Sequence, residues 1–457
     1  MSSGKRWRRN NTEGEERMFS RNDLIKLMIP LIVEQILAVL VGMADVVMVA
    51  SVGEAAVSGV SLVDSINILL IQLLSAMATG GAVVAAQYLG NKDETHACMA
   101  ANQLLLFNTV FSLAVMAIVL IFNKGMLRLI FGSIADDVMY NAEVYFQITA
   151  LSFPFLAVYN SCAALYRSMG NSKISMYTSL VMNGINIAGN ALCVFGLGMG
   201  VEGVAYPTLV SRTVAALIIL WLVRNPKNKI HVDSRLRLGF HPRMIRRILK
   251  IGVPNGLENS MFQFGKLMIQ SLVSTLGTSS IAAFAVASNI VTIEYLPGNA
   301  LGLGLITVVG QCVGAGEFQQ AEEYTKKIIK VNYIILAVVA TGLALLSTPV
   351  AGIYNLSPEA SDLAVSMIVV HSIAMLIWPT SFTLPNALRA ASDVKFTMVI
   401  SVFSMWAFRI GFSYLFILGF KMNIMGIWFA MFVDWLFRDA CFIPRFLRGK
   451  WKKYPSI

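Results

Sequence analysis

The chain has 457 residues, of which 56% are hydrophobic and only 13% are charged, and its mean hydropathy is +0.68. Soluble proteins carry about 25% charged residues, so a chain this apolar must have lipid as its solvent. The net charge of +11 comes without any DNA- or RNA-binding motif, and nucleic acid is excluded as a partner. The scattered His and Cys residues form no metal-binding pattern, so neither a metal nor another cofactor is expected.

Twelve apolar runs follow one another along the chain, each long enough to span the membrane with about 20 residues. A basic tail at 1–23 precedes them and lacks the apolar core of a signal peptide. A basic segment at 224–246 divides the runs six and six, and a basic tail at 445–457 follows them. The expected spans are 24–51, 55–81, 97–122, 140–165, 174–199, 201–223, 247–273, 281–311, 328–350, 364–390, 396–419 and 423–444.

The two halves repeat each other at a shift of 224 residues, from IPLIVEQ at Pro30 to VPNGLEN at Pro254. The same shift relates Lys26 to Lys250, Glu34 to Glu258, Gly53 to Gly277, Gly80 to Gly304, Gln87 to Gln311 and Gly90 to Gly314. Because each repeat holds an even number of spans, the halves should be related by an axis along the membrane normal. The sequence predicts an all-α membrane protein with two six-helix lobes, 24–223 and 247–444.

Basic residues outside the spans lie almost entirely on the side of the two tails and the 224–246 segment. The opposite side holds only Lys124, Arg128 and Lys421. The positive-inside rule therefore predicts a multi-pass protein of the plasma (inner) membrane with both termini in the cytoplasm. We expect it to function as a monomer among membrane lipids.

Ionisable residues inside the spans are costly in lipid and are the candidates for function. Asp45 is the only carboxylate centred in the first span, and it can gain and lose a proton. Asn186 and Asn190 are four residues apart, so they share one helical face. Candidates for gating or structural roles are Glu34, Asp64, Arg212 and Arg409.

A polar cluster for substrate binding or gating is expected in the second lobe. Lys266 corresponds to Gly42 under the repeat, and a lone ammonium in hydrocarbon needs a partner. We expect that partner to be Glu294 in the next span, with Glu258 as the second candidate. Asp434 and Arg438, at i and i+4, are expected to pair within one helix.

No phosphate-binding loop and no catalytic constellation is present, so the chain is expected to be neither an ATPase nor another enzyme. The motifs IPLxxEQ, VGxxxVSG, AxQYLG, LYRSMGN, GLGMGVEGVA and LRAASD, in this order over residues 20–445, resemble those of multidrug and toxic compound extrusion (MATE) transporters. The resemblance implies export of cationic, amphipathic drug-like compounds in exchange for H⁺ or Na⁺.

The resemblance also implies a cation site formed by Asp45, Asn186, Asn190 and Thr208. The family's second acid in the fifth span is replaced here by Asn190, which favours H⁺ over Na⁺ as the coupling ion. A Glu that many members carry in the seventh span is replaced by Phe262.

Two further expectations concern the space between the lobes. The 24 Met and 26 Phe residues suggest a cavity lined by adaptable Met and Phe side chains. The alternative function is a flippase of related architecture that moves lipid-linked oligosaccharides. It would need a cationic cavity for a pyrophosphate group, to which Arg212, Lys266 and Arg409 are the candidate contributors.

Overall fold

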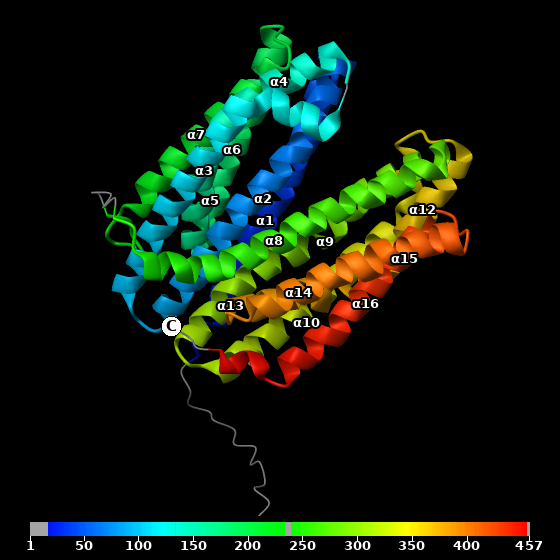
Figure 1. Ribbon diagram of the computed structural model, residues 1–457. Helices are drawn as coiled ribbons and strands as arrows, with labels where there is room; N and C mark the ends of the chain where they lie inside the picture. The colour runs from blue at the N-terminus through cyan, green and yellow to red at the C-terminus, as the bar shows by residue number, and fades with distance from the viewer. Residues whose placement is uncertain (1–16, 133, 234–238, 455–457) are drawn as a thin grey trace, which may run out of the picture.

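The computed structural model describes residues 17–132, 134–233 and 239–454, which are helical apart from short connections (Figure 1). The first half contains α1 (Arg21–Ala50), α2 (Glu54–Gly90), α3 (Glu94–Phe131), α4 (Asp136–Leu151), α5 (Phe153–Ser168), α6 (Ser172–Ala191) and α7 (Glu202–Val223). The second half contains α8 (Pro242–Val273), α9 (Thr278–Gly314), α10 (Phe318–Leu345), α11 (Ser347–Gly352), α12 (Pro358–Ala374), α13 (Leu384–Ala390), α14 (Val394–Ser404), α15 (Gly411–Tyr414) and α16 (Met425–Leu447).

Short irregular turns continue several of these helices. The π-helical turns are Leu192–Gly196, Pro379–Thr383, Met405–Ile410 and Leu415–Gly419, and the 3₁₀ turns are Ser274–Leu276 and Lys450–Lys453. The basic tails and the basic segment expected at 1–23, 445–457 and 224–246 lie partly outside the described residues.

Each of the twelve predicted spans coincides with a helix or with helices in tandem. In the described part of the chain, eight helices are long and apolar enough to cross a membrane. Two pairs bent by 46° and 68°, α4 with α5 and α12 with residues 379–390, qualify together. The remaining two predicted spans correspond to α8 and α16, which have 32 and 23 residues and carry more ionisable side chains. The prediction of an all-α multi-pass membrane protein is confirmed.

The helices form two bundles, α1–α7 and α8–α16, which meet at one end and diverge toward the other (Figure 1). The end where they meet bears the C-terminal end of α16 and the connections after α2, α5, α7, α9 and α13, and we name it the closed side. The opposite end, with the connections after α1, α3, α8 and α10, is the open side.

The first turns of α1 pack into the core of the second bundle, and the first turns of α8 pack into the core of the first bundle. Leu24 and Leu27 of α1 lie in an apolar cluster with residues of α9. Ile248 and Ile251 of α8 lie in a cluster with residues of α2 and α3. The repeat relates Leu24 to Ile248 and Leu27 to Ile251, so the exchange is reciprocal, and burial of these side chains holds the closed side together.

Glycines of the repeat permit the close crossing of α2 and α9 on this side. A Cβ atom at Gly90 would collide with the backbone of Gln311, and a Cβ atom at Gly314 would collide with the backbone of Gln87. Only glycine allows two helix backbones to approach so closely. The two contacts are equivalent under the 224-residue repeat.

The same two glutamines also bridge the bundles by hydrogen bonds. The Gln87 amide donates to the backbone carbonyl of Ala390 at 2.7 Å, and the Gln311 amide donates to the backbone carbonyl of Ser168 at 2.6 Å. Each bond therefore runs from one half of the chain to the end of a helix in the other half. These side chains fix the register of the two bundles on the closed side.

Candidate functional site

The four residues predicted for a cation site lie in one chain of hydrogen bonds within the first bundle. The Asn190 amide donates to the Asp45 carboxylate at 2.7 Å and lies 3.4 Å from the Asn186 carbonyl oxygen. The Asn186 amide in turn donates to the Thr208 hydroxyl at 3.0 Å. Because Asn186 and Asn190 are one turn apart on α6, one helix face connects Asp45 of α1 to Thr208 of α7. Asn186, Asn190 and Thr208 are buried, whereas Asp45 is half-buried.

Asp64 and Arg212, predicted as gating or structural residues, lie in the same bundle. Asp64 lies on α2 and Arg212 lies on α7. The Tyr145 hydroxyl donates to Asp64 at 3.3 Å, and the Arg212 guanidinium donates to the Ser152 hydroxyl at 2.8 Å. Sequence reasoning did not identify Tyr145, because a tyrosine in an apolar run carries no signal of its own. The first bundle thus gathers two carboxylates and one guanidinium around a polar chain.

Glu34 and Glu258 form equivalent contacts in the two bundles. Glu34 lies 3.6 Å from the Arg167 guanidinium and accepts a hydrogen bond of 2.7 Å from the Ser175 hydroxyl. Glu258 pairs with Arg389 at 2.6 Å. The two arginines lie within the LYRSMGN and LRAASD motifs, so each motif supplies a cation to the carboxylate that follows the helix proline.

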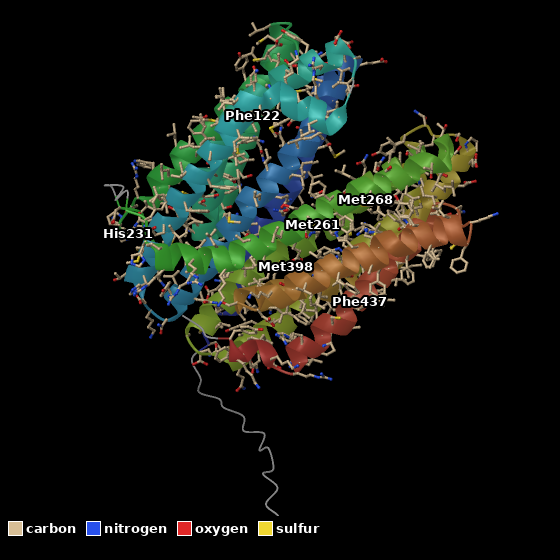
Figure 2. The ribbon with its side chains drawn as sticks, viewed as in Figure 1. Phe122, His231, Met261, Met268, Met398 and Phe437 are labelled. Atoms are coloured by element: carbon tan, nitrogen blue, oxygen red, sulfur yellow. The ribbon has the colours of Figure 1, made fainter. Side chains whose placement is uncertain are left out.

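A cavity of about 880 Å³ lies mainly in the second bundle and reaches residues of α1 and α2. Besides methionine and phenylalanine, the side chains that line it include one tyrosine and three tryptophans, which were not expected. The labelled methionines Met261, Met268 and Met398 on α8 and α14 (Figure 2) are not among the described residues that line it. Two methionines and three phenylalanines do line the cavity, as expected, although the three labelled methionines do not. The sulfur-containing and aromatic lining residues are Met405, Met431, Phe262, Phe284, Phe382, Tyr295, Trp378, Trp428 and Trp435.

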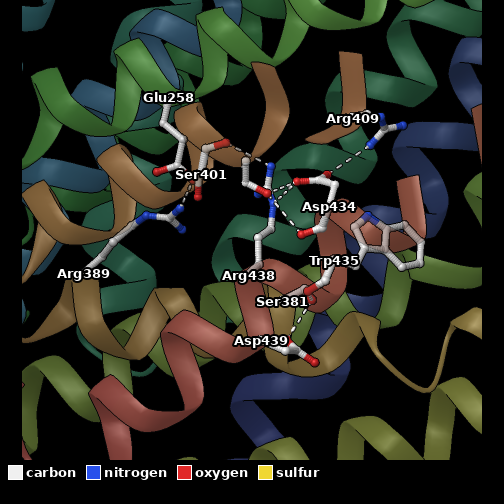
Figure 3. A network of polar contacts seen from close by, with 10 residues as sticks. Glu258, Ser381, Arg389, Ser401, Arg409, Asp434, Trp435, Arg438 and Asp439 are labelled. Carbon is white, nitrogen blue, oxygen red and sulfur yellow. Dashed lines mark hydrogen bonds and ion pairs between the residues drawn. The ribbon is translucent and has the colours of Figure 1, made fainter. Parts of the chain in front are cut away.

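A group of cations surrounds one carboxylate at the wall of this cavity (Figure 3). Asp434 pairs with Arg438 at 2.9 Å, as predicted from their spacing, and lies 4.0 Å from Arg409. Ser404 also donates a hydrogen bond to Asp434. Arg409 lies in the π-helical turn Met405–Ile410, the kind of local widening often found at functional sites.

The predicted pair between Lys266 and Glu294 does not form. Glu294 is fully buried, lies 2.5 Å from the His371 ring and accepts a hydrogen bond from Ser372. Lys266 instead projects into the cavity, with its ammonium 5.1 Å from the centre of the Phe262 ring. It forms no hydrogen bond or ion pair with any residue that the structure describes. The second candidate, Glu258, is occupied by Arg389.

The prediction failed because the repeat places a helix position without fixing the direction of its side chain. Glu294 lies on the face of α9 that meets α12, and its partner there is His371 of α12. The only feature of the sequence that could have indicated this pair is the presence of His371 within an apolar run.

Two repeated bundles with a cavity that reaches across from one to the other define the class of membrane transporters built from internal repeats. The MatE family model matches residues 30–192 and again residues 254–415. The chain therefore belongs to this family of multidrug and toxic compound extrusion (MATE) transporters, whose members are transporters and not enzymes.

The relatives match nearly the whole chain. It is 27% identical over 435 residues to the uncharacterized transporter YisQ of Bacillus subtilis (strain 168), covering 94% of each chain. It is 25% identical over 450 residues to the probable multidrug resistance protein NorM of Thermotoga maritima, covering 95% of this chain and 93% of the relative. A crystal structure of MATE in the straight conformation matches with a TM-score of 0.88 at 20% identity, over 94% of this chain and 97% of the other, which shows the shared fold.

Proposed function

We propose that this protein exports amphipathic organic compounds in exchange for H⁺, and that Asp45 binds the coupling ion. The observation that carries the proposal is the continuous chain of hydrogen bonds from Asp45 through Asn190 and Asn186 to Thr208. A half-buried carboxylate inside a span is costly when charged, and protonation removes that cost. Because Asn190 donates to the charged carboxylate, loss or gain of a proton changes how strongly α1 is held to α6.

Only one carboxylate takes part in this chain, since Asp64 bonds to Tyr145 instead. A hard cation such as Na⁺ gains less from one carboxylate than from two, which favours H⁺. Na⁺ is the second candidate because the side-chain carbonyl oxygen of Asn190 is buried and has no hydrogen-bond partner in the described part of the chain. That oxygen is available as a neutral ligand beside Asp45.

We further propose that the closed side faces the cytoplasm of a cell's plasma (inner) membrane. The connections on that side, together with the tails, carry nearly all the basic residues outside the spans. The cavity then opens away from the cytoplasm, as expected of an exporter after it has released its substrate. The lobes 24–223 and 247–444 would act as the two bodies that move.

The charge of the substrate is the point at which two proposals differ. The resemblance implies organic cations, but Glu258 is the one carboxylate among the cavity-lining residues, against four basic side chains. The flippase alternative is favoured by Lys266 and Arg409 at the cavity wall. Its third expected contributor, Arg212, lies in the first bundle and bonds to Ser152, so it does not belong to this cationic group.

Transport in proteoliposomes tests the proposal. Vesicles with entrapped pyranine would report H⁺ movement when dansylcadaverine or dansylglycine is added under an imposed pH gradient or an imposed Na⁺ gradient. Asp45→Asn keeps the hydrogen-bonding shape and removes titration, so it should abolish H⁺-coupled export, whereas Asp362→Asn on the surface of α12 should not. Normal H⁺ coupling in Asp45→Asn would refute the role of Asp45, and coupling to Na⁺ alone would replace H⁺ as the ion.

A further inference from the structure

Basic side chains dominate the ionisable lining of the cavity. Some of these cations pair with a carboxylate, whereas others have no full counter-charge among the described residues. Glu258 neutralises Arg389 at 2.6 Å, and Asp434, behind the wall, contacts Arg438 at 2.9 Å. The charged lining residues are Lys266, Arg389, Arg409, Arg438 and Glu258.

Two of the four cations are left without a full counter-charge. Arg409 reaches the already paired Asp434 only at 4.0 Å, and its Nε atom is buried with no hydrogen-bond partner in the described residues. Lys266 has no ion pair with a described residue, and its side chain is exposed into the cavity. Even with Asp434 counted, the cavity wall carries a surplus of two positive charges at Lys266 and Arg409.

The ring of Phe262 lies among three of these cations. Its centre is 5.1 Å from the Lys266 ammonium, 5.4 Å from the Arg409 guanidinium and 6.0 Å from that of Arg438. A cation over an aromatic face is attracted by the negative face of the ring, but the ring carries no net charge. Phe262 therefore lessens the cost of gathering these cations and leaves their charge uncompensated.

We propose that this group of side chains is a binding site for the oxyanion of an amphipathic organic anion, a carboxylate, sulfonate or phosphate. Lys266 and Arg409 would bind the oxyanion, because ammonium and guanidinium groups are the strong partners of such groups. The apolar body would lie against the aromatic wall of Tyr295, Trp378 and Phe382, whose rings stack in sequence at 6.0 and 5.1 Å. The inference rests on the proposed export function and names its substrate class.

The same oxyanion chemistry has two sources, a soluble organic anion and a polyprenyl diphosphate lipid. We favour the soluble anion because Lys266 and Arg409, the two cations without a full counter-charge, lie beside one ring, which suits a single oxyanion. A lipid diphosphate would present two phosphate groups and a long chain that must leave the cavity toward the membrane. The two sources are distinguished by competition.

Binding to the purified full-length protein in nanodiscs tests the site. Dansylglycine and dansylcadaverine share one fluorophore and differ in the sign of their charge, and energy transfer from the cavity tryptophans reports their binding. Dansylglycine should bind about tenfold tighter or more, and its binding should weaken with salt. Farnesyl diphosphate is added as the lipid competitor. Displacement by it only at concentrations well above those of dansylglycine supports the soluble source, and tighter binding by it would overturn that assignment in favour of a lipid diphosphate.

Charge variants separate the site from general effects. Lys266→Gln and Arg409→Gln should each weaken dansylglycine binding about tenfold, whereas Lys330→Gln on the exposed face of α10 should not change it. Phe262→Glu and Phe262→Gln both remove the ring, but only the first supplies a carboxylate to the cations. Phe262→Glu should therefore bind dansylglycine about tenfold more weakly than Phe262→Gln and should improve the binding of dansylcadaverine.

Equal or tighter binding of dansylcadaverine to the natural protein would overturn the proposal. So would equal dansylglycine binding by Phe262→Glu and Phe262→Gln, which would show that charge at this position does not matter. Asp45→Asn should retain anion binding in this assay even where it abolishes coupled export. Failure of the anion site is therefore distinguishable from failure of the proposed H⁺ exchange.

Discussion

Gln87 and Gln311 occupy equivalent positions in the two halves, and each donates a hydrogen bond to a backbone carbonyl of the opposite half. Both bonds lie on the closed side, where α2 and α9 cross at Gly90 and Gly314. Alternating access requires that these contacts separate when the transporter opens on this side. The two glutamines therefore bear directly on the balance between the two conformations.

Replacing both glutamines by leucine should favour separation of the closed side. Each lost hydrogen bond is worth about 0.5–1.5 kcal/mol. The double variant should therefore raise the population of molecules whose closed side has separated about tenfold. Spin labels at Asn91 and Ala315, the residues that directly follow α2 and α9, would report the separation as a longer distance. Asn123→Leu removes a hydrogen bond of 2.8 Å to the backbone carbonyl of Glu143 within the first bundle, and it serves as the control. Unchanged distances in the double variant would show that the bonds do not hold the side closed.

Asn190→Asp should make export respond to Na⁺. The substitution places a second carboxylate beside Asp45, where the amide now donates at 2.7 Å, and two carboxylates neutralise a cation better than one. Export driven by a Na⁺ gradient should increase roughly tenfold, a change of about 1.4 kcal/mol. Asn183→Asp, on the same helix but near Ser179 instead, should not show this gain. If both variants respond to Na⁺ equally, the position of the acid is not what selects the ion.

Glu294→Gln should destabilise the protein without acting through Lys266. The substitution disrupts the buried contacts with His371 and Ser372, and a buried polar group left without a partner costs about 1–3 kcal/mol. The melting temperature in detergent should therefore fall, and the double variant with His371→Gln should fall by less than the sum of the single changes. Lys266→Gln should leave the melting temperature nearly unchanged. Equal losses for Lys266→Gln and Glu294→Gln would point to a coupling that the structure does not contain.

A membrane-impermeant maleimide tests the orientation. Cysteine at Lys229, exposed in the α7–α8 connection, should react only from the cytoplasm, and cysteine at Tyr354, exposed beyond α11, should react from outside. The neighbouring Ile230 is fully buried and would be a poor labelling site. Labelling of either position from the opposite face would contradict the topology inferred from the basic residues.

The order and extent of the spans could be predicted because composition alone encodes them. In α1, for example, the apolar run expected at 24–51 is the helix Arg21–Ala50. The polar chain at Asp45 could be anticipated from the resemblance to MATE transporters, whereas spacing alone places Asn186 and Asn190 on one face of α6 without showing which helix that face meets. Contacts between distant helices could not, because they depend on how each helix is rotated about its axis. The partner of Glu294 and those of Glu34 and Glu258 are of this kind.

The unpaired ammonium of Lys266 has a consequence for the membrane potential. An exporter that exchanges a monovalent organic cation for one H⁺ moves no net charge. One that releases a monovalent anion and admits one H⁺ carries two positive charges inward in each cycle. Each charge gains about 2.3 kcal/mol per 100 mV from a potential that is negative inside. If the proposed anion site and H⁺ exchange operate together, the membrane voltage, and not only the pH gradient, would drive export.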